Sequence, residues 1–233
     1  MKLNKRECSI SIELVPCGAD MLKIIMVIGE DRHIFWASSV MGYQFFSFVE
    51  AIYQLYSEVP DTHHIVNYGT IHKAVFSYPD DDPSLQEDEI RVKTSFSWDG
   101  EGMSYTTITL NRKCRHWNYP SDGKDLIELS ITNSQEDPFV YIVDGHDLCY
   151  AVAKAYTETI KKHGIYGYYL STGGNCNGIG DTIDLHMILF IKAYALDAME
   201  VRELKTVWKG DQRWQKAVGT SLNKEIELLL FDM

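Results

Sequence analysis

Two stretches with a shared pattern decide the fold that the sequence predicts. They are Val40-Met-Gly-Tyr-Gln-Phe-Phe-Ser-Phe-Val-Glu-Ala-Ile-Tyr53 and Val143-Asp-Gly-His-Asp-Leu-Cys-Tyr-Ala-Val-Ala-Lys-Ala-Tyr156. At an offset of 103 residues, valine, glycine, valine and tyrosine coincide. In both stretches a β-like run ends, a glycine follows, and apolar residues then recur with the spacing of an amphipathic helix. We interpret the pair as the sheet-to-helix junctions of a duplicated unit.

The first unit is predicted to contain three strands and a helix. The strand-like runs are residues 9–16, 22–28 and 33–40, and Gly29-Glu-Asp-Arg32 between the last two is typical of a hairpin turn. After Gly42, a stripe of apolar residues at helical spacing predicts one buried helix face: Phe45, Val49, Ile52 and Tyr56. Pro60 ends this helix because proline disfavours helical backbone in the residue before it.

The second unit repeats this order of elements. Strand-like runs cover residues 90–98, 105–110, 126–132 and 139–143, and Asp99-Gly-Glu-Gly102 predicts a turn between the first two. Gly145 opens the second helix and Gly164 is placed to end it. The predicted fold class is therefore α+β: a duplicated β-β-β-α unit whose antiparallel sheets pack on helices, followed by a mainly helical C-terminal extension.

The predicted domain boundaries follow from composition. Residues 1–78 form the first unit, 79–89 an acidic linker, 90–164 the second unit and 165–233 the extension. The stretch 78–89 contains six acidic residues, no basic residue and two prolines, so it is expected to stay extended at the surface. The alternative is that both units share one sheet and one core, as a single pseudo-symmetric domain.

The extension is harder to assign. Residues 165–170 are predicted to be a short aromatic strand and 225–231 a final strand. Residues 182–191 alternate well enough for a strand, but helix-forming residues dominate from 185 to 205, which favours a long helix over 182–208. A short helix is expected after Gly210.

Composition bounds the class of protein. Hydrophobic residues make up 45% of the chain and charged residues 24%, which is typical of a soluble globular protein. The net charge of −11 disfavours nucleic-acid binding, which needs a basic surface. No apolar run is long enough to cross a membrane. Five cysteines without a Cys-x-x-Cys pair indicate reduced thiols and a cytoplasmic location.

The glycine-rich loop at 171–181 is the first candidate site. Its backbone amides are candidates to hold an anion: those of Gly173, Gly174, Asn175 and Gly178. The phosphate-binding pattern fails, however, because Ile179-Gly180 stands where lysine and serine or threonine are needed. Cys176 is a candidate nucleophile, but the sequence selects no histidine as its base. The alternatives are a flexible connection and an ordinary loop cysteine.

Aromatic residues form the second candidate site. Trp117, Tyr119, Tyr168 and Tyr169 lie beside glycine, proline and charged residues, a setting typical of binding hot spots. The same residues also serve to cover sheet edges and cores. His63-His64 and His72 are not predicted to form a metal site, because adjacent histidines point apart in regular structure. We predict neither a metal nor another cofactor.

Three functions remain open at this stage. The first is a cytoplasmic interaction protein of the inhibitor or immunity type, which binds a basic partner through an acidic surface. The second is a small-ligand protein or thiol enzyme with its site at 171–181. The third is a homo-oligomer that pairs through exposed sheet edges. Because no catalytic signature is present, the sequence favours a binding protein over an enzyme.

Overall fold

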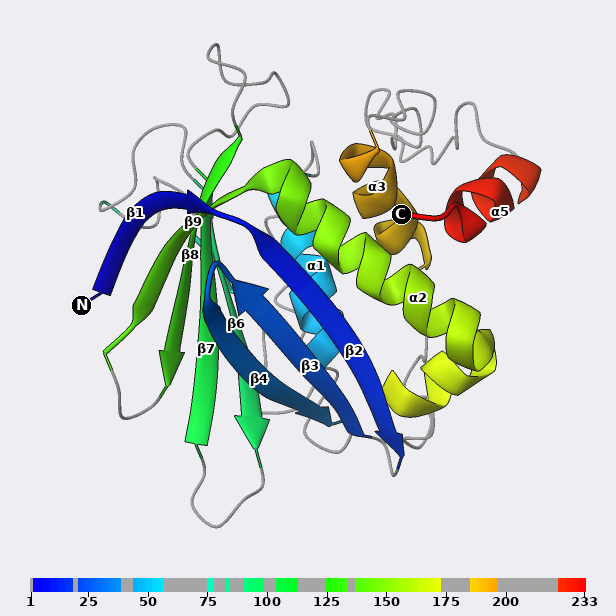
Figure 1. Cartoon of the computed structure of the whole chain (residues 1–233), viewed down its shortest axis with the longest axis horizontal. Helices are drawn as coiled ribbons and strands as arrows, with labels where there is room; N and C mark the ends of the chain where they lie inside the picture. Colours follow the sequence, from blue (N-terminus) through cyan, green and yellow to red (C-terminus); the bar gives the residue numbers. More distant parts are fainter. Residues whose placement is uncertain are drawn as a thin grey trace, which may run out of the picture.

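The structure is a computed structural model, and it describes residues 2–18, 21–38, 44–56, 75–77, 83, 90–98, 104–112, 125–133, 137–172, 185–196 and 222–233. Two β-sheets and four helices lie in this part of the chain (Figure 1). The mixed α and β content agrees with the predicted class. None of the described helices is both long and apolar enough to cross a membrane.

A three-stranded antiparallel sheet forms the front layer in Figure 1. It consists of β2 (Ile10–Gly18), β3 (Met21–Ile28) and β4 (Asp31–Ser38), in that order. The predicted hairpin is confirmed: Gly29, between β3 and β4, has a φ of 60°, which favours glycine. Alternate residues point into the core, among them Leu14, Ile24 and Phe35.

The larger sheet has six strands. In spatial order they are β1 (Lys2–Cys8), β9 (Phe139–Asp144), β8 (Leu126–Asn133), β7 (Ser104–Arg112), β6 (Ile90–Trp98) and β5 (Val75–Ser77). The strands β6 to β9 lie where the sequence predicted strands. All four predicted runs before the second helix are therefore strands, one more than a β-β-β-α unit contains.

The strand β1 was not predicted, and it joins the two sheets. It pairs with β9 in parallel, while the chain continues after Ser9 into β2 of the other sheet. The Gly29 amide donates a hydrogen bond to the Ser9 carbonyl at 2.9 Å, which fixes this crossing against the β3–β4 turn. The strand β1, at the start of the chain, is thus an edge strand of the six-stranded sheet, whose other strands come later in the sequence. The predicted domain boundaries stay a prediction.

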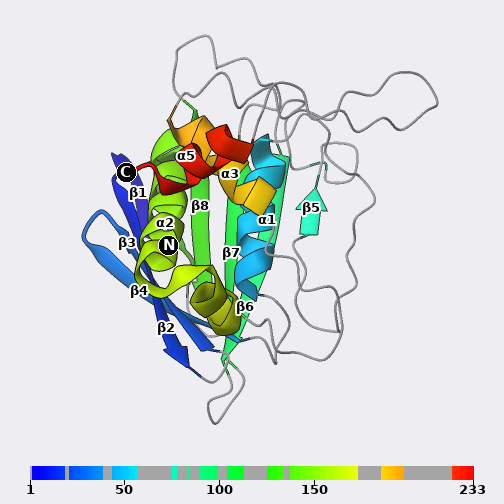
Figure 2. The same ribbon diagram turned by 90° about the vertical axis from the view of Figure 1, so that its right-hand side faces the viewer.

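The two long helices each pack on strands of the other half. The helix α1 (Gln44–Tyr56) follows β4 but packs chiefly on β6. The helix α2 (Gly145–Thr172) follows β9 but packs chiefly on β2 (Figure 2). One hydrophobic core therefore contains both helices and the inner faces of both sheets, as shown by Ile52, Leu129 and Val152.

Two strand predictions in the extension are wrong. Residues 165–170 are helical: Gly164, with φ 73° and ψ 166°, interrupts α2, and the helix then resumes to Thr172. Residues 225–231 lie mostly in the helix α5 (Leu222–Leu230), because Leu228 packs against the helix α3 (Leu185–Ala195). The structure thus confirms a helix within 182–191. The predicted short helix after Gly210 lies outside the described residues.

A buried lysine fixes the C-terminal helix. Lys192 on α3 is fully buried, and its Nζ donates to Thr157 Oγ1 at 2.9 Å and to the carbonyls of Leu229 at 3.1 Å and Phe231 at 2.7 Å. Carbonyls at a helix C-terminus lack intrahelical donors, so this ammonium group caps the end of α5. The fold therefore depends here on a charge placed among apolar helices.

Replacing Lys192 with methionine should release this end of the chain. We expect a loss of about 1–3 kcal/mol in the free energy of unfolding at neutral pH, because the carbonyls lose a buried donor. Burial and the nearby Lys161 lower the pKa of Lys192 from 10.5 to about 8, whereas Asp232 raises it. The unfolded chain thus holds this proton more tightly, and the native protein gains stability as the pH rises from about 8 to 10.5.

Urea unfolding at about pH 7 and about pH 10 measures both effects. The methionine variant has no ammonium group here, so its free energy of unfolding should not increase between pH 8 and 10.5. The difference in unfolding free energy between the unsubstituted protein and this variant should therefore increase with pH. Lys161→Met is the matched control, because the exposed Lys161 pairs with Asp232 in the same segment. Equal losses in the two variants would contradict the capping role of Lys192.

Candidate functional site

The N-terminal end of α2 is built around Asp144, the last residue of β9. The Asp144 Oδ1 accepts hydrogen bonds from the amides of His146 at 2.8 Å and Asp147 at 3.3 Å, so Asp144 is the N-cap of the helix. Gly145 between them donates its amide to the Asp125 carbonyl at 2.6 Å. The sheet thus fixes the direction in which the first turn of α2 presents its side chains.

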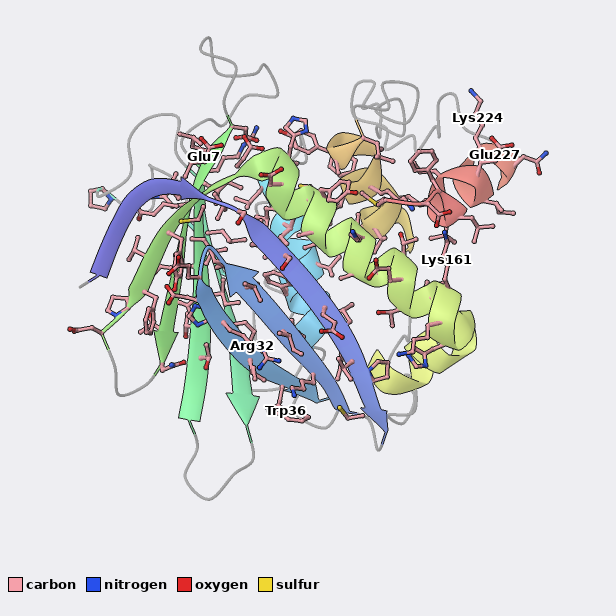
Figure 3. The ribbon with its side chains drawn as sticks, in the orientation of Figure 1. Glu7, Arg32, Trp36, Lys161, Lys224 and Glu227 are labelled. Carbon is pink, nitrogen blue, oxygen red and sulfur yellow. The ribbon has the colours of Figure 1, made fainter. Side chains whose placement is uncertain are left out.

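Three carboxylates gather at this end of the helix. Glu7 on β1, labelled in Figure 3, and Asp144 both act on the charge of Asp147, and we call these three residues the acidic head of α2. Burial, and then the charges of Asp144 and Glu7, raise the pKa of Asp147, while His146 lowers it. A helix N-terminus usually stabilises a carboxylate. The pKa of Asp147 is raised overall, so desolvation and repulsion by the neighbouring carboxylates outweigh the effect of the helix dipole.

The surface around the acidic head is open. Asp147 is exposed, and Tyr150, about one helical turn further, is 36% exposed. Lys154 lies over the Tyr150 ring, with Nζ 5.9 Å from the centroid. Within the described part of the chain, no three carboxylate, imidazole or thiol groups converge in an arrangement that would hold a metal ion. This surface combines negative charge with an accessible aromatic ring.

Beneath the acidic head, four side chains form a continuous stack. The His146 ring lies 4.4 Å from that of Tyr194, and the Tyr194 ring lies 4.3 Å from that of Tyr56. The Arg112 guanidinium lies 4.4 Å from the centroid of the Tyr56 ring. The stack runs from the partly exposed imidazole to a buried cation, and it connects α2, α3, α1 and β7.

Asp125 closes the stack into a ring of contacts. Its Oδ1 accepts from Arg112 Nε at 2.9 Å, and its Oδ2 accepts from the Tyr194 hydroxyl at 2.7 Å. Arg112 also donates to the Leu55 carbonyl at 2.9 Å, at the end of α1. Arg112 and Asp125 are 3% and 2% exposed, and removing one member of such a buried pair costs about 3–5 kcal/mol.

The groups in this cluster are poorly suited to acid–base or nucleophilic chemistry. Burial, followed by the charge of Asp125, raises the pKa of Tyr194 and that of the Cys149 thiol. Burial also raises the pKa of Tyr56. These hydroxyl and thiol groups therefore stay protonated near neutral pH, and a protonated thiol is a weak nucleophile. The cluster positions the head of α2 instead of supplying a reactive group.

A second polar chain joins the two sheets. The Tyr141 hydroxyl on β9 donates to Asp31 Oδ2 at 3.0 Å and accepts from His33 Nε2 at 2.8 Å. The His33 ring also lies edge-on to Phe139 at 5.3 Å. Burial lowers the pKa of His33, and Asp31 offsets part of that effect. This chain fixes the β3–β4 hairpin against β9.

Most of the predicted site residues lie outside the part of the chain that the structure describes. Trp117, Tyr119 and the loop residues Gly173, Gly174, Asn175, Cys176 and Gly178 lie outside the described residues. Tyr168 and Tyr169 lie in the helical segment of α2 after Gly164, but their side chains are not described. These predictions therefore stay predictions.

Sequence reasoning did not identify the acidic head. Asp144 had a usable signal, since aspartate immediately before a helix start is a common N-cap. No local sequence signal identifies Glu7, because Glu7 comes close to α2 only through the parallel pairing of β1 with β9. The chain matches no family model, no curated protein and no solved structure.

Gly145 leaves no room for a larger residue. A Cβ at this position would overlap the Tyr56 hydroxyl and lie 2.7 Å from Asp125 Oδ2. Gly145→Ala should therefore lower the free energy of unfolding by about 1–3 kcal/mol, the usual cost of overpacking. In a Tyr56→Phe background, which removes the overlapping hydroxyl, the same change should cost less. A double-mutant cycle by urea unfolding measures this coupling, and strict additivity would contradict it.

The His33 chain should make the protein sensitive to acid. The lowered pKa of His33 means that the unfolded chain binds this proton first, so native stability is lost as the pH falls through about 6.5. His33→Gln keeps a donor for Tyr141 but cannot titrate, so its stability should fall less steeply. Thermal unfolding at a series of pH values tests this, with the exposed His163→Gln as control. Identical profiles for the two variants would exclude His33 as the cause.

Proposed function

We propose that the protein acts by binding a basic protein partner, and that the acidic head of α2 is the contact site. The observation that carries this proposal is the exposed position of Asp147 in the first turn of α2, beside the capping Asp144, where burial and then the charges of Asp144 and Glu7 raise the pKa of Asp147. A carboxylate whose charge the fold disfavours is typical of functional sites. A lysine or arginine from a partner would remove that repulsion.

The energetics of such a contact are favourable. The folded protein holds the Asp147 charge less readily than the unfolded chain does, so the charge lowers stability near neutral pH. A cation bound at the acidic head would reverse the sign of the local field. Part of the partner's binding energy would thus come from relief of repulsion that already exists in the free protein. Charged pairs at the rim of an interface act mainly on the association rate and on specificity.

Other features support a basic partner. The net charge of −11 would attract a cationic protein from a distance and raise its association rate at low salt. Tyr150 offers an amphipathic ring beside the carboxylates, and tyrosine is enriched at binding hot spots. Together these features favour an inhibitor or immunity type of protein, located in the cytoplasm, over a catalyst. The exchange of α1 and α2 between the two sheets supports a duplicated unit as its architecture.

A small-ligand or thiol-dependent site at 171–181 remains the alternative proposal. It rests on the sequence of that loop and on Cys176.

Neutralising the acidic head should abolish partner capture. The double variant Glu7→Gln/Asp147→Asn removes two charges from the site, whereas Glu158→Gln/Glu227→Gln removes two exposed charges from α2 and α5 elsewhere. We expect immobilised protein to retain basic proteins from native lysate at low salt, and the head variant to retain at least tenfold less. Quantitative mass spectrometry of the retained proteins measures the difference.

The matched control distinguishes a site from a general charge effect. Both double variants have the same net charge, so equal losses would assign binding to overall charge and not to the acidic head. Retention that survives high salt would also contradict the electrostatic contact. Because Asp147→Asn relieves repulsion, the head variant should be at least as stable as the unsubstituted protein.

A further inference from the structure

The helix α5 is attached to the rest of the protein by little apolar surface. Among the side chains described for residues 223–233, Leu228 alone is buried, in a small cluster with α3 that is separate from the main core, while Leu229 and Met233 are partly buried. Three large apolar side chains of this segment are instead exposed to solvent: Ile226 by 43%, Leu230 by 51% and Phe231 by 54%. In Figure 1 the helix lies at the margin of the molecule, against α3. Its detachment would therefore expose little additional apolar area.

Hydrogen bonds from one ammonium group fix the C-terminal end of this helix. Lys192 Nζ donates to Thr157 Oγ1 on α2 and to the carbonyls of Leu229 and Phe231, so each of its three protons has an acceptor. Two of these acceptors belong to the C-terminal segment, and Lys192 itself is fully buried. Detachment of α5 would leave this ammonium group to be hydrated by water. The docking of α5 and the protonation of this amine are therefore coupled.

We propose that residues 222–233 form a latch that opens while the rest of the fold stays intact, and that protonation of Lys192 controls how often it opens. Segments with few buried apolar contacts open by local unfolding, at a much lower free-energy cost than the whole protein. The helix α5 has nine residues, and an isolated helix of that length is marginally stable in water. An open latch would thus lose its helical structure, so closing depends on the contacts with Lys192 and around Leu228.

The charged groups that act on Lys192 lie on the two elements beside it. Lys161 on α2 disfavours the ammonium form, and Asp232 in the latch favours it. Lys161 and Asp232 also form an ion pair, but the Asp232 side chain is 96% exposed, and such a pair contributes little to stability. Burial is the largest effect, and it lowers the pKa of Lys192 to about 8. The closed latch therefore holds this proton less tightly than the open latch does.

The latch should close more tightly as the pH rises. Opening hydrates Lys192 and returns its pKa to the ordinary 10.5, so the closed form loses this proton at lower pH than the open form does. The ratio of closed to open latch is therefore lowest below pH 8 and increases up to pH 10.5. Between about pH 7 and about pH 9 the expected increase is about tenfold. The neutral amine still has two protons, which suffice for the carbonyls of Leu229 and Phe231.

Amide hydrogen exchange of the full chain, followed by mass spectrometry at about pH 7 and about pH 9, tests the latch. Dividing each observed rate by the intrinsic rate at the same pH gives the protection that structure provides. At the lower pH, the amides of α5 should be protected about a hundredfold less than buried amides of α2, such as that of Val152. At the higher pH, the protection of α5 should be about tenfold greater. Protection of α5 equal to that of α2, or without this increase, would overturn the proposal.

Substitutions test the role of the lysine itself. Lys192→Met removes the titrating group, so α5 should lose about tenfold in protection at the lower pH and gain none at the higher pH. Lys161→Met is the matched control, because it removes a neighbouring charge and leaves Lys192 in place, so an increase with pH should remain. An unchanged increase in Lys192→Met would contradict the proposal, and the pH profile of the unsubstituted protein decides alone if that variant does not fold. The acidic-head variant Glu7→Gln/Asp147→Asn should leave the latch unaltered, so this proposal and the basic-partner proposal fail separately.

Discussion

The buried Arg112–Asp125 pair is the interaction on which the arrangement of this protein most depends. Its atoms contact the end of α1, the start of α2 and the side of α3, so one charged pair fixes three helices against the larger sheet. A buried ion pair contributes little net stability compared with a well-packed apolar pair, but each partner alone would be costly. The pair therefore acts mainly on geometry, and it determines where the acidic head of α2 lies.

Polar groups are used in the same way at other junctions between elements. Tyr141 connects Asp31 and His33 across the two sheets, and Lys192 caps the end of α5 from within the helix layer. In each case the strands and helices bury their apolar faces, and one satisfied polar group selects a single relative position. Shifts in pKa accompany these contacts because burial, not reactivity, is the common cause.

The sequence predicted much of the local structure and little of its assembly. The runs in β2 to β4 and β6 to β9 were identified because alternation and turn residues are local signals, and Val49 and Ile52 marked the buried face of α1 correctly. The first strand was missed because its partner, β9, lies more than 130 residues away. The final helix was mistaken for a strand because Leu228 packs only in the context of α3. The exchange of α1 and α2 between the sheets likewise has no local signature.

The same limit applies to the candidate site. The acidic head joins Glu7, near one end of the chain, to Asp144 and Asp147, and only the parallel β1–β9 pair brings them together. Sequence reasoning instead favoured contiguous motifs, such as the glycine-rich loop. A surface built from distant segments cannot be recognised in the sequence until the strand pairing that brings those segments together is known. A partner bound across Glu7 and Asp147 would therefore hold β1 against the N-terminal end of α2, so binding and the union of the two sheets would stabilise each other.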